Sequence, residues 1–195
     1  MSKDRWRDHY TDEAKRKGYL ARSVFKLKEA DERFRLVRAG ARVLDLGCAP
    51  GSWLQYLSRK VGRDGLVVGI DINEPAFSAH NVRIIVADIF ELDASELAEF
   101  GRFDLVVSDA APATTGVPDA DAAKSLRLAV RAFEIATSVL KGGGNLLVKV
   151  FESPDVKTLR DKMRERFSSV RSFKPRASRS ASREHYLVGL GFKGE

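Results

Sequence analysis

The fold is decided by the stretch Val43-Leu44-Asp45-Leu46-Gly47-Cys48-Ala49-Pro50-Gly51-Ser52-Trp53. Its apolar beginning predicts a buried strand, its glycine-containing middle a tight turn, and its end the start of a helix. Glycine lets a backbone approach a bound ligand closely and adopt conformations closed to other residues. A helix that starts directly after such a turn offers free N–H groups and a partial positive charge. The stretch therefore predicts a ligand-binding turn at the end of a strand.

Strands and helices alternate on both sides of this turn. Helices are expected at residues 23–34, 52–61, 121–140 and 155–167. Ser23 is the expected N-cap of the first of these helices. The run Lys141-Gly142-Gly143-Gly144 is expected to end the long helix with a left-handed glycine cap. Strands are expected at residues 42–46, 66–71, 82–87, 103–109, 145–151, 169–173 and 185–189.

The expected strands are short and nearly all apolar, as in Leu66-Val67-Val68-Gly69-Ile70. Such strands are buried on both faces, which is typical of a parallel sheet covered by helices. No clear helix separates the last two strands, so they are expected to form a hairpin. The pattern predicts an α/β doubly wound fold, with a mostly parallel sheet and an antiparallel last strand.

The chain has 195 residues, of which 44% are hydrophobic and 31% charged, which suits one globular domain. We expect a basic helical segment over residues 1–35 and a core over residues 36–195. No apolar run approaches the ~20 residues of a membrane helix, and the N-terminus is charged where a signal peptide would be apolar. A cytoplasmic protein without a membrane partner is expected. A monomer is also expected, although the sequence carries no signal for the oligomeric state.

Charge is distributed unevenly along the chain. Residues 1–30 hold nine Lys/Arg against five Asp/Glu, and residues 157–183 hold ten against two. Residues 41–110 hold six Lys/Arg against eleven Asp/Glu. Two basic ends around an acidic middle suit a polyanion that lies across a face built from both termini. The alternative is an ordinary basic surface exposed to solvent.

Three aspartates follow successive strands of the predicted sheet: Asp71, Asp88 and Asp109. A dinucleotide-binding turn reads G-x-G-x-x-G, whereas this turn reads G-x-x-x-G and lacks the middle glycine that admits a pyrophosphate. Three carboxylates suit a cofactor with positive charge and no phosphate, a description that fits S-adenosylmethionine and not NAD. Taken singly, each aspartate could equally form a turn or cap a helix.

Trp53 and Cys48 lie in or directly after the predicted turn. Trp53 could pack in the core or lie against the cofactor, and its place in the first helical turn favours the cofactor edge. Cys48 is expected to be a small turn residue without chemistry, because no histidine lies near it in sequence. A single cysteine also excludes an internal disulfide and a multi-cysteine zinc site, and no metal is expected.

A lysine interrupts the apolar strand Leu147-Val148-Lys149-Val150-Phe151. A charged amine is costly to bury, so Lys149 is either an edge residue that reaches water or a functional amine. Together with this strand, four further stretches resemble the FtsJ/RrmJ-type RNA ribose 2′-O-methyltransferases. The five are residues 19–27, 44–53 and 182–186, Ser108-Asp109-Ala110-Ala111-Pro112, and Val148-Lys149-Val150-Phe151.

The resemblance runs from about residue 5 to residue 190. It implies a Rossmann-like methyltransferase fold with S-adenosylmethionine as the methyl donor. It implies a catalytic tetrad of Lys26, Asp109, Lys149 and Glu184. It also implies cofactor contacts at Gly51, Trp53, Asp71, Asp88 and Asp109, to which the turn itself adds Gly47.

A ribose 2′-hydroxyl is a poor nucleophile until it loses its proton. Lys149 can remove that proton only as a neutral amine, which burial, Lys26 and the sulfonium favour. Asp109 and Glu184 favour the charged form, and their expected task is to orient the amine and hold the substrate. Lys26 would stabilise the developing alkoxide. The protonation state of Lys149 is left open by these opposing effects.

Basic residues of both termini lead into the tetrad, where RNA phosphates would lie. The expected RNA-binding residues are Lys15, Arg16, Lys17, Arg22, Arg176, Arg179 and Arg183, and Phe25 and Phe173 could either stack on bases or lie in the core. A 2′-hydroxyl target makes the substrate RNA and excludes DNA. The chain most resembles members that methylate a uridine of 23S ribosomal RNA. The alternatives are a tRNA methyltransferase, an inactive RNA chaperone on the same fold and an NAD-dependent oxidoreductase.

Overall fold

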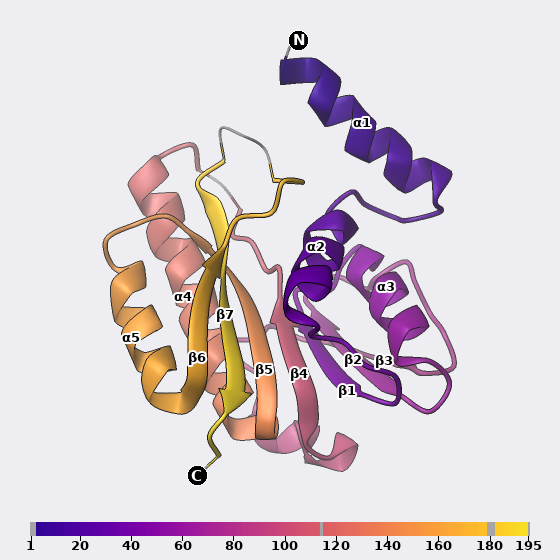
Figure 1. Ribbon diagram of the computed structural model, residues 1–195, viewed down its shortest axis with the longest axis vertical. Helices are drawn as coiled ribbons and strands as arrows, with labels where there is room; N and C mark the ends of the chain where they lie inside the picture. Colours follow the sequence, from indigo (N-terminus) through magenta and orange to yellow (C-terminus); the bar gives the residue numbers. More distant parts are fainter. Residues whose placement is uncertain (1–2, 114, 179–181, 195) are drawn as a thin grey trace.

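The computed structural model describes residues 3–113, 115–178 and 182–194, with side chains from residue 9 onward. Its core is a seven-stranded sheet in the order β3-β2-β1-β4-β5-β7-β6 (Figure 1). Neighbouring strands among β1–β5 run parallel, and β7 runs antiparallel to both β5 and β6. The predicted α/β fold, with a mostly parallel sheet and an antiparallel last strand, is confirmed. The strands are β1 (Arg42–Leu46), β2 (Leu66–Asp71), β3 (Val82–Val86), β4 (Phe103–Ser108), β5 (Leu140–Phe151), β6 (Phe167–Phe173) and β7 (Glu184–Phe192).

Helices cover both faces of the sheet (Figure 1). On one face, α2 and α3 bury Leu27 and Leu54 against strand residues such as Val67. On the other, α4 and α5 bury apolar side chains against the opposite faces of the same strands. Burial on both faces explains why the strands read as nearly continuous apolar runs. The helices are α1 (Lys3–Arg16), α2 (Val24–Phe34), α3 (Ser52–Val61), α4 (Pro118–Val139) and α5 (Val156–Arg166), with one 3₁₀ helix, η1 (Ala94–Phe100).

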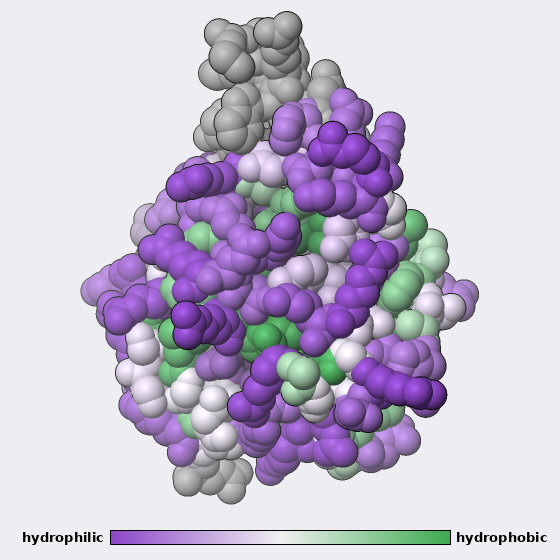
Figure 2. All heavy atoms as spheres, turned by 45° about the vertical axis from the view of Figure 1, so that its right-hand side comes forward, coloured by the Kyte–Doolittle hydropathy of each residue, from purple (hydrophilic) through white to green (hydrophobic). Residues whose placement is uncertain are grey.

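The surface is strongly polar. Figure 2 shows hydrophilic residues over most of one face, with apolar residues confined to scattered patches between them. The longest helix, α4, has 22 residues and carries several charged side chains. Within the described ranges, no helix has the length and apolar character needed to cross a lipid bilayer.

The glycine tract after α4 acts differently from the prediction. The expected left-handed glycine cap is wrong, because α4 ends at Val139 and Leu140 is already extended, with φ −67° and ψ 145°. The strand β5 begins at once, and its buried Leu140 packs in the core. Within the tract, Gly143 has a φ of +80°, and the β4–β5 pairing shifts register nearby. The glycines therefore shape an irregular start of β5 instead of ending a helix.

Candidate active site

A cavity of about 590 Å³ opens at the carboxyl ends of β1, β2 and β4. Its volume falls within the roughly 300–1,000 Å³ that is typical of small-molecule sites. Two cations of α4, Lys124 and Arg127, line one side. Four of the six predicted cofactor-binding residues line the cavity: Gly47, Asp71, Asp88 and Asp109.

Gly47 allows the turn after β1 to pack directly on the segment after β4. Its φ is +80°, and a Cβ at this position would lie 2.6 Å from the Cα of Ala110. Non-bonded carbon atoms essentially never approach each other so closely, so only glycine fits at this position without a backbone shift. The close approach brings the cavity floor next to Asp109, which follows β4.

The aspartates at the cavity wall retain capacity to bind a ligand. Asp71 Oδ2 accepts from the Ala49 N–H at 3.0 Å, and its Oδ1 accepts from the Asn73 backbone N–H at 2.9 Å and the Asn73 side-chain amide at 3.5 Å. Asp88 accepts from the Phe90 N–H at 2.9 Å. A carboxylate has about four lone-pair sites, so each of these groups can also accept from a ligand hydroxyl or amine. The donor set thus fits a cofactor that carries ribose hydroxyls, an amino group and positive charge.

The other two predicted cofactor residues, Gly51 and Trp53, do not line this cavity. Trp53 is buried, and its indole Nε1 donates to the Ser23 carbonyl at 2.9 Å. Ser23 is the N-cap residue of α2, as predicted, but its hydroxyl lies 2.9 Å from the Ser52 hydroxyl and makes no capping hydrogen bond. These contacts fix the start of α2 on the start of α3, which positions Lys26 one turn further along α2.

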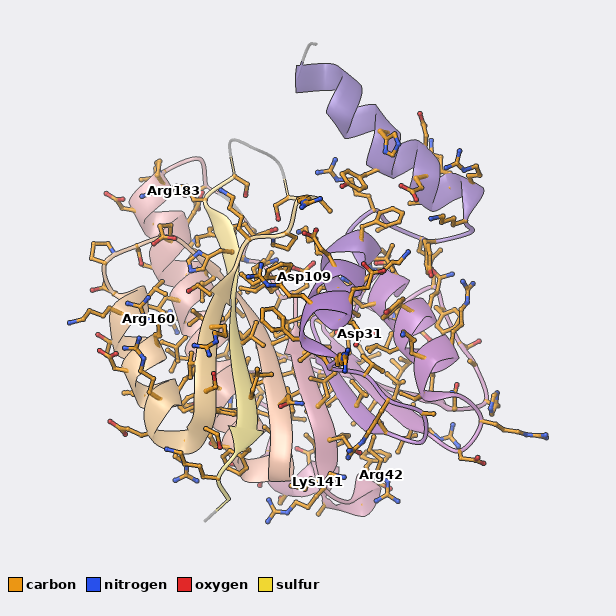
Figure 3. All side chains as sticks on the ribbon, in the orientation of Figure 1. Asp31, Arg42, Asp109, Lys141, Arg160 and Arg183 are labelled. Carbon is orange, nitrogen blue, oxygen red and sulfur yellow. The ribbon has the colours of Figure 1, made fainter. Side chains whose placement is uncertain are left out.

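The four residues of the predicted tetrad contact one another, and one of them, Asp109, also lies in the cavity wall (labelled in Figure 3). Lys149 Nζ lies 3.0 Å from Asp109 Oδ1 and donates to the Asp109 carbonyl at 2.5 Å. Lys26 Nζ lies 2.8 Å from both carboxylate oxygens of Glu184 and 3.9 Å from Asp109 Oδ1. The Lys149 side chain is only 5% exposed. Two amines and two carboxylates thus form one nearly buried cluster.

Asp109 is the shared anion of this cluster. Burial alone would raise the pKa of the Asp109 carboxyl, but the charges of Lys149 and Lys26 and a hydrogen bond from Tyr186 outweigh it and lower that pKa. The carboxylate therefore stays ionised at neutral pH. It can hold the Lys149 amine at a fixed position and direction.

Tyr186 belongs to the same cluster; it lies in the stretch 182–186 that carries the resemblance, but the sequence predicted no role for it. Its hydroxyl donates to Asp109 Oδ1 at 2.6 Å, and its ring packs near Trp53 at 6.2 Å. Burial and the charges of Asp109 and Glu184 raise the pKa of the Tyr186 phenol, so it remains a neutral donor. Its spacing of two residues from Glu184 is a further signal, because it places both side chains on one face of a strand.

Asp45 is a second buried carboxyl without an assigned role. It lies in β1, is 0% exposed, and neither of its oxygens has a hydrogen-bond partner among the described residues. Burial raises the pKa of Asp45 well above its ordinary value, and the charges of Asp109 and Asp71 add to the shift. A carboxylate inside an otherwise apolar strand was the signal that could have marked it.

Asp45→Asn is expected to stabilise the protein increasingly as pH rises. Unfolded Asp45 ionises above its ordinary pKa near 3.8, whereas folded Asp45 holds its proton to higher pH, so folding loses stability across this window. Asparagine cannot ionise and escapes this loss. Thermal unfolding of both proteins at pH 4.5, 6 and 7.5 measures the effect. Each kcal/mol gained in the free energy of unfolding should raise the melting temperature of the variant by roughly 2–4 °C. A destabilised variant at pH 7.5 would contradict the assignment, and Asp64→Asn in an exposed loop is the control.

The predicted RNA-binding residues that the structure describes lie at the end of the molecule where α1 and the end of β6 are found (Figure 1). Lys15, Arg16 and Arg176 are exposed, and Arg183 approaches Asp119 of α4 at 3.9 Å. Arg179 lies outside the described residues. The remaining two are Lys17, paired with Glu13, and Arg22, which is partly buried.

Three further residues, Phe25, Phe173 and Cys48, lie in the core. Phe25 and Phe173 are 6% and 3% exposed, so their rings are packed inside and are not presented to bases. Cys48 is buried, and burial raises the pKa of its thiol, which fits a residue without chemistry. Within residues 3–113, 115–178 and 182–194, no group of three or more His, Cys, Asp or Glu side chains could hold a metal ion.

Comparison with known proteins agrees with the fold and the resemblance. The model of the FtsJ-like methyltransferase family matches residues 19–192. The ribosomal RNA large subunit methyltransferase E of Desulfatibacillum aliphaticivorans is 45% identical over 98% of this chain and 94% of its own length. The protein of the same description from Oleidesulfovibrio alaskensis is 47% identical over 97% of this chain and 94% of its own. A crystal structure described as a ribosomal RNA methyltransferase from Plasmodium falciparum superposes with a TM-score of 0.80 at 26% identity, covering 91% of this chain and all of that one. The chain belongs to the FtsJ-like methyltransferase family.

Proposed function

We propose that this protein methylates the 2′-hydroxyl of a ribose in RNA, with a uridine of 23S ribosomal RNA as its target. The observation that carries the proposal is the nearly buried cluster of Lys149, Asp109, Lys26 and Glu184 at the edge of a cavity suited to a cationic cofactor. Relatives 45% and 47% identical over nearly the whole chain are described as large-subunit ribosomal RNA methyltransferases. That description supports the choice of RNA.

S-adenosylmethionine supplies an electrophilic methyl group when it is bound in the cavity. Gly47, Asp71 and Asp88 line the cavity and hold the cofactor. Gly51 and Trp53 act on the site indirectly, since they lie outside the lining and Trp53 holds the Ser23 carbonyl at the start of α2. Asp109 lies in the wall of this cavity and also contacts the Lys149 amine, so it joins the cofactor site to the catalytic cluster.

Lys149 acts as the general base that takes the proton of the 2′-hydroxyl. Asp109 holds the amine through its carboxylate and its carbonyl, so the lone pair is confined to one direction. Lys26, held by Glu184, supplies positive charge to the oxygen as it becomes anionic. Correct placement of the hydroxyl opposite the methyl group contributes much of the rate.

The whole chain, residues 1–195, works as one methyltransferase domain. Its basic N-terminal helical segment, residues 1–35, joins the core of residues 36–195 through α2, which carries Lys26. RNA crosses the basic end of the molecule, and the protein acts as a monomer in the cytoplasm, where ribosomal subunits are found. The residues that contact phosphates are Lys15, Arg16, Lys17, Arg22, Arg176, Arg179 and Arg183.

The function is tested with labelled methyl donor, large ribosomal subunits and bulk tRNA. We expect label in 23S ribosomal RNA, and mass mapping of its nucleotides to show one 2′-O-methyluridine. Exclusive labelling of tRNA would overturn the choice of substrate. Cofactor binding without labelling of any RNA would favour the inactive RNA-binding alternative.

Asp71→Ala is expected to weaken cofactor binding. Each hydrogen bond to a charged carboxylate contributes about 1.5–3 kcal/mol, so the dissociation constant should rise by roughly 10- to 100-fold. Calorimetric titration with S-adenosylmethionine measures this change, and Asp64→Ala is the exposed control. An unchanged dissociation constant would remove Asp71 from the cofactor site. Because Asp71 also holds the Ala49 N–H, a thermal unfolding curve must show that the variant folds normally.

A further inference from the structure

A second cavity, of about 540 Å³, lies on the other side of the last strands. It is open to solvent and is lined by the β5–α5 connection, the first turns of α5, the end of β6 and the start of β7. Its charged or polar lining includes Lys157, Arg160, Lys174, His185, Glu152 and Ser153. The proposed methylation chemistry makes no use of this cavity.

The cavity has an excess of positive charge. Among the described residues, neither Lys157 nor Arg160 forms an ion pair, and the buried Nε of Arg160 has no hydrogen-bond partner. Lys174 donates to the Ser182 carbonyl at 2.9 Å, which holds its charge beside the cavity. The single acidic side chain in the lining, Glu152, is 72% exposed. Three cations thus face one solvated carboxylate.

Two buried polar atoms in the lining, His185 Nδ1 and the Ser153 hydroxyl oxygen, lack a hydrogen-bond partner in the described part of the chain. His185 is 8% exposed, and its Nδ1 lies 3.1 Å from Glu152 Oε2 without making a hydrogen bond. The hydroxyl of Ser153 is also buried and unpartnered. Buried polar groups are nearly always satisfied, so such a pair in one cavity indicates a missing partner. The unpartnered Ser153 hydroxyl beside Lys157 and Arg160, which form no ion pair, suits a ligand with several anionic oxygens.

The position of His185 relates this cavity to the tetrad. His185 follows Glu184 directly in β7, and successive side chains of a strand point to opposite faces of the sheet. Glu184 and His185 pair with Phe151 and Val150 at the end of β5, so both lie at the same edge of the sheet. A chain that passes over the first residues of β7 would run from the tetrad to the cavity.

We propose that this cavity binds a backbone phosphate of the substrate RNA, next to the nucleotide whose ribose is methylated. Lys157 and Arg160 provide the charge, and the His185 imidazole and Ser153 hydroxyl donate to the phosphate oxygens. Burial lowers the pKa of His185 although the charge of Glu152 and a backbone hydrogen bond to Arg183 raise it, and the charges of Lys174 and Arg160 add to the decrease, so the imidazole serves as a neutral donor. Figure 3 shows Arg160 on α5, away from α1 and α2. This inference rests on the proposed function and extends the RNA path beyond the basic termini.

The first test removes two charges from the cavity with the double variant Lys157→Gln/Arg160→Gln. The probe is a fluorescent single-stranded oligouridylate, and its dissociation constant is measured at several salt concentrations. We expect roughly tenfold weaker binding, and a salt dependence whose slope falls by about 0.7 for each phosphate that the variant no longer neutralises. Affinity for S-adenosylmethionine and the melting temperature should not change.

The matched control is the double variant Arg63→Gln/Lys162→Gln. It removes the same two charges at exposed positions outside the cavity lining, one in the turn after α3 and one on α5. If the cavity variant and the control bind oligouridylate equally well, the proposal is overturned. This binding result is independent of catalysis, so it stands even if the wild-type protein methylates no RNA.

The second test locates the phosphate. Neutral methylphosphonates replace single phosphates, one at a time, in an RNA fragment that contains the methylated nucleotide. We expect one substitution near that nucleotide to weaken wild-type binding while leaving the Lys157→Gln/Arg160→Gln variant unaffected. Equal losses in both proteins at every position would overturn the proposal. Perturbation of the His185 imidazole NMR signal by inorganic phosphate, but not by the RNA fragment, would mean that the cavity binds free phosphate and would also overturn it.

Discussion

Lys149→Met is expected to reduce the rate of methyl transfer by at least about 10³-fold, because the general base is lost while the apolar volume in β5 is kept. The substitution suits its surroundings, since the Lys149 side chain is 5% exposed and its strand neighbours Val148 and Val150 are fully buried. Single-turnover transfer from labelled donor to large ribosomal subunits measures the rate. Calorimetric titration should show that S-adenosylmethionine still binds.

The control for this variant is Lys141→Met, the same change at the opposite end of the same strand (Figure 3). Lys141 is 42% exposed and pairs with Asp104, which is also paired with Arg38, so its loss should leave the rate unchanged. Wild-type activity in Lys149→Met would exclude Lys149 as the base. Equal losses in the two variants would show that the effect is structural.

Asp109→Asn is expected to produce the largest loss of stability among the cluster residues. It leaves two nearly buried amines, Lys149 and Lys26, without their shared carboxylate. Breaking a buried charge pair by removing one partner costs about 3–5 kcal/mol. In a chain of this length the melting temperature should fall by roughly 10 °C. Methyl transfer should fall as well, because the Lys149 amine loses its orienting partner.

The pH dependence of this loss follows from the lowered pKa of Asp109. The folded carboxyl ionises more readily than the unfolded one, so its contribution to stability is complete above its ordinary pKa near 3.8. That contribution disappears as pH falls through the lowered folded value. The difference in melting temperature between wild type and variant should therefore be full at pH 7 and shrink in acid. A difference that does not change with pH would contradict this assignment.

Two further variants separate charge from packing in the same experiment. Asp161→Asn removes a half-exposed carboxylate that pairs with Arg164 three residues along α5, and should change stability by less than about 0.5 kcal/mol. Asp109→Asn combined with Lys149→Met should be more stable than Asp109→Asn alone, because the unpaired amine is removed with its partner. Simple addition of the two single losses would show that the residues are not coupled.

Local patterns were sufficient for the fold. The strands at 42–46 and 66–71 and the helix at 52–61 have the expected ends. Their boundaries are marked within a few residues by apolar runs, glycines and strand-ending aspartates. The left-handed helix cap predicted for the glycines at 142–144 does not form, because the same residue type also suits an irregular strand start. Which of the two forms depends on whether Leu140 finds a place in the core.

The sequence likewise indicated some residues of the candidate site and not others. Lys149 and Asp109 stood out in the sequence because one interrupts an apolar strand and the other ends one, whereas Lys26 and Glu184 were implied by the family resemblance. Trp53 was expected at the cofactor edge, but its indole is used to hold the start of α2. Tyr186 and Asp45 received no role, because a tyrosine or an isolated carboxyl in a strand gives no indication of what lies across the sheet.

The sequence by itself determined the succession of strands and helices along the chain, the ligand-binding turn and the residue types available for chemistry. These features depend on neighbours only a few positions away. Only the tertiary structure decided which side chains meet. Lys26 and Glu184 are 158 positions apart in the sequence. They are in contact because β7 pairs with β5, and because α2 packs on the face of the sheet from which the Glu184 side chain projects. The burial of each group follows from that long-range packing, including the burial that raises the pKa of Asp45 and that of the unpartnered Ser153 hydroxyl.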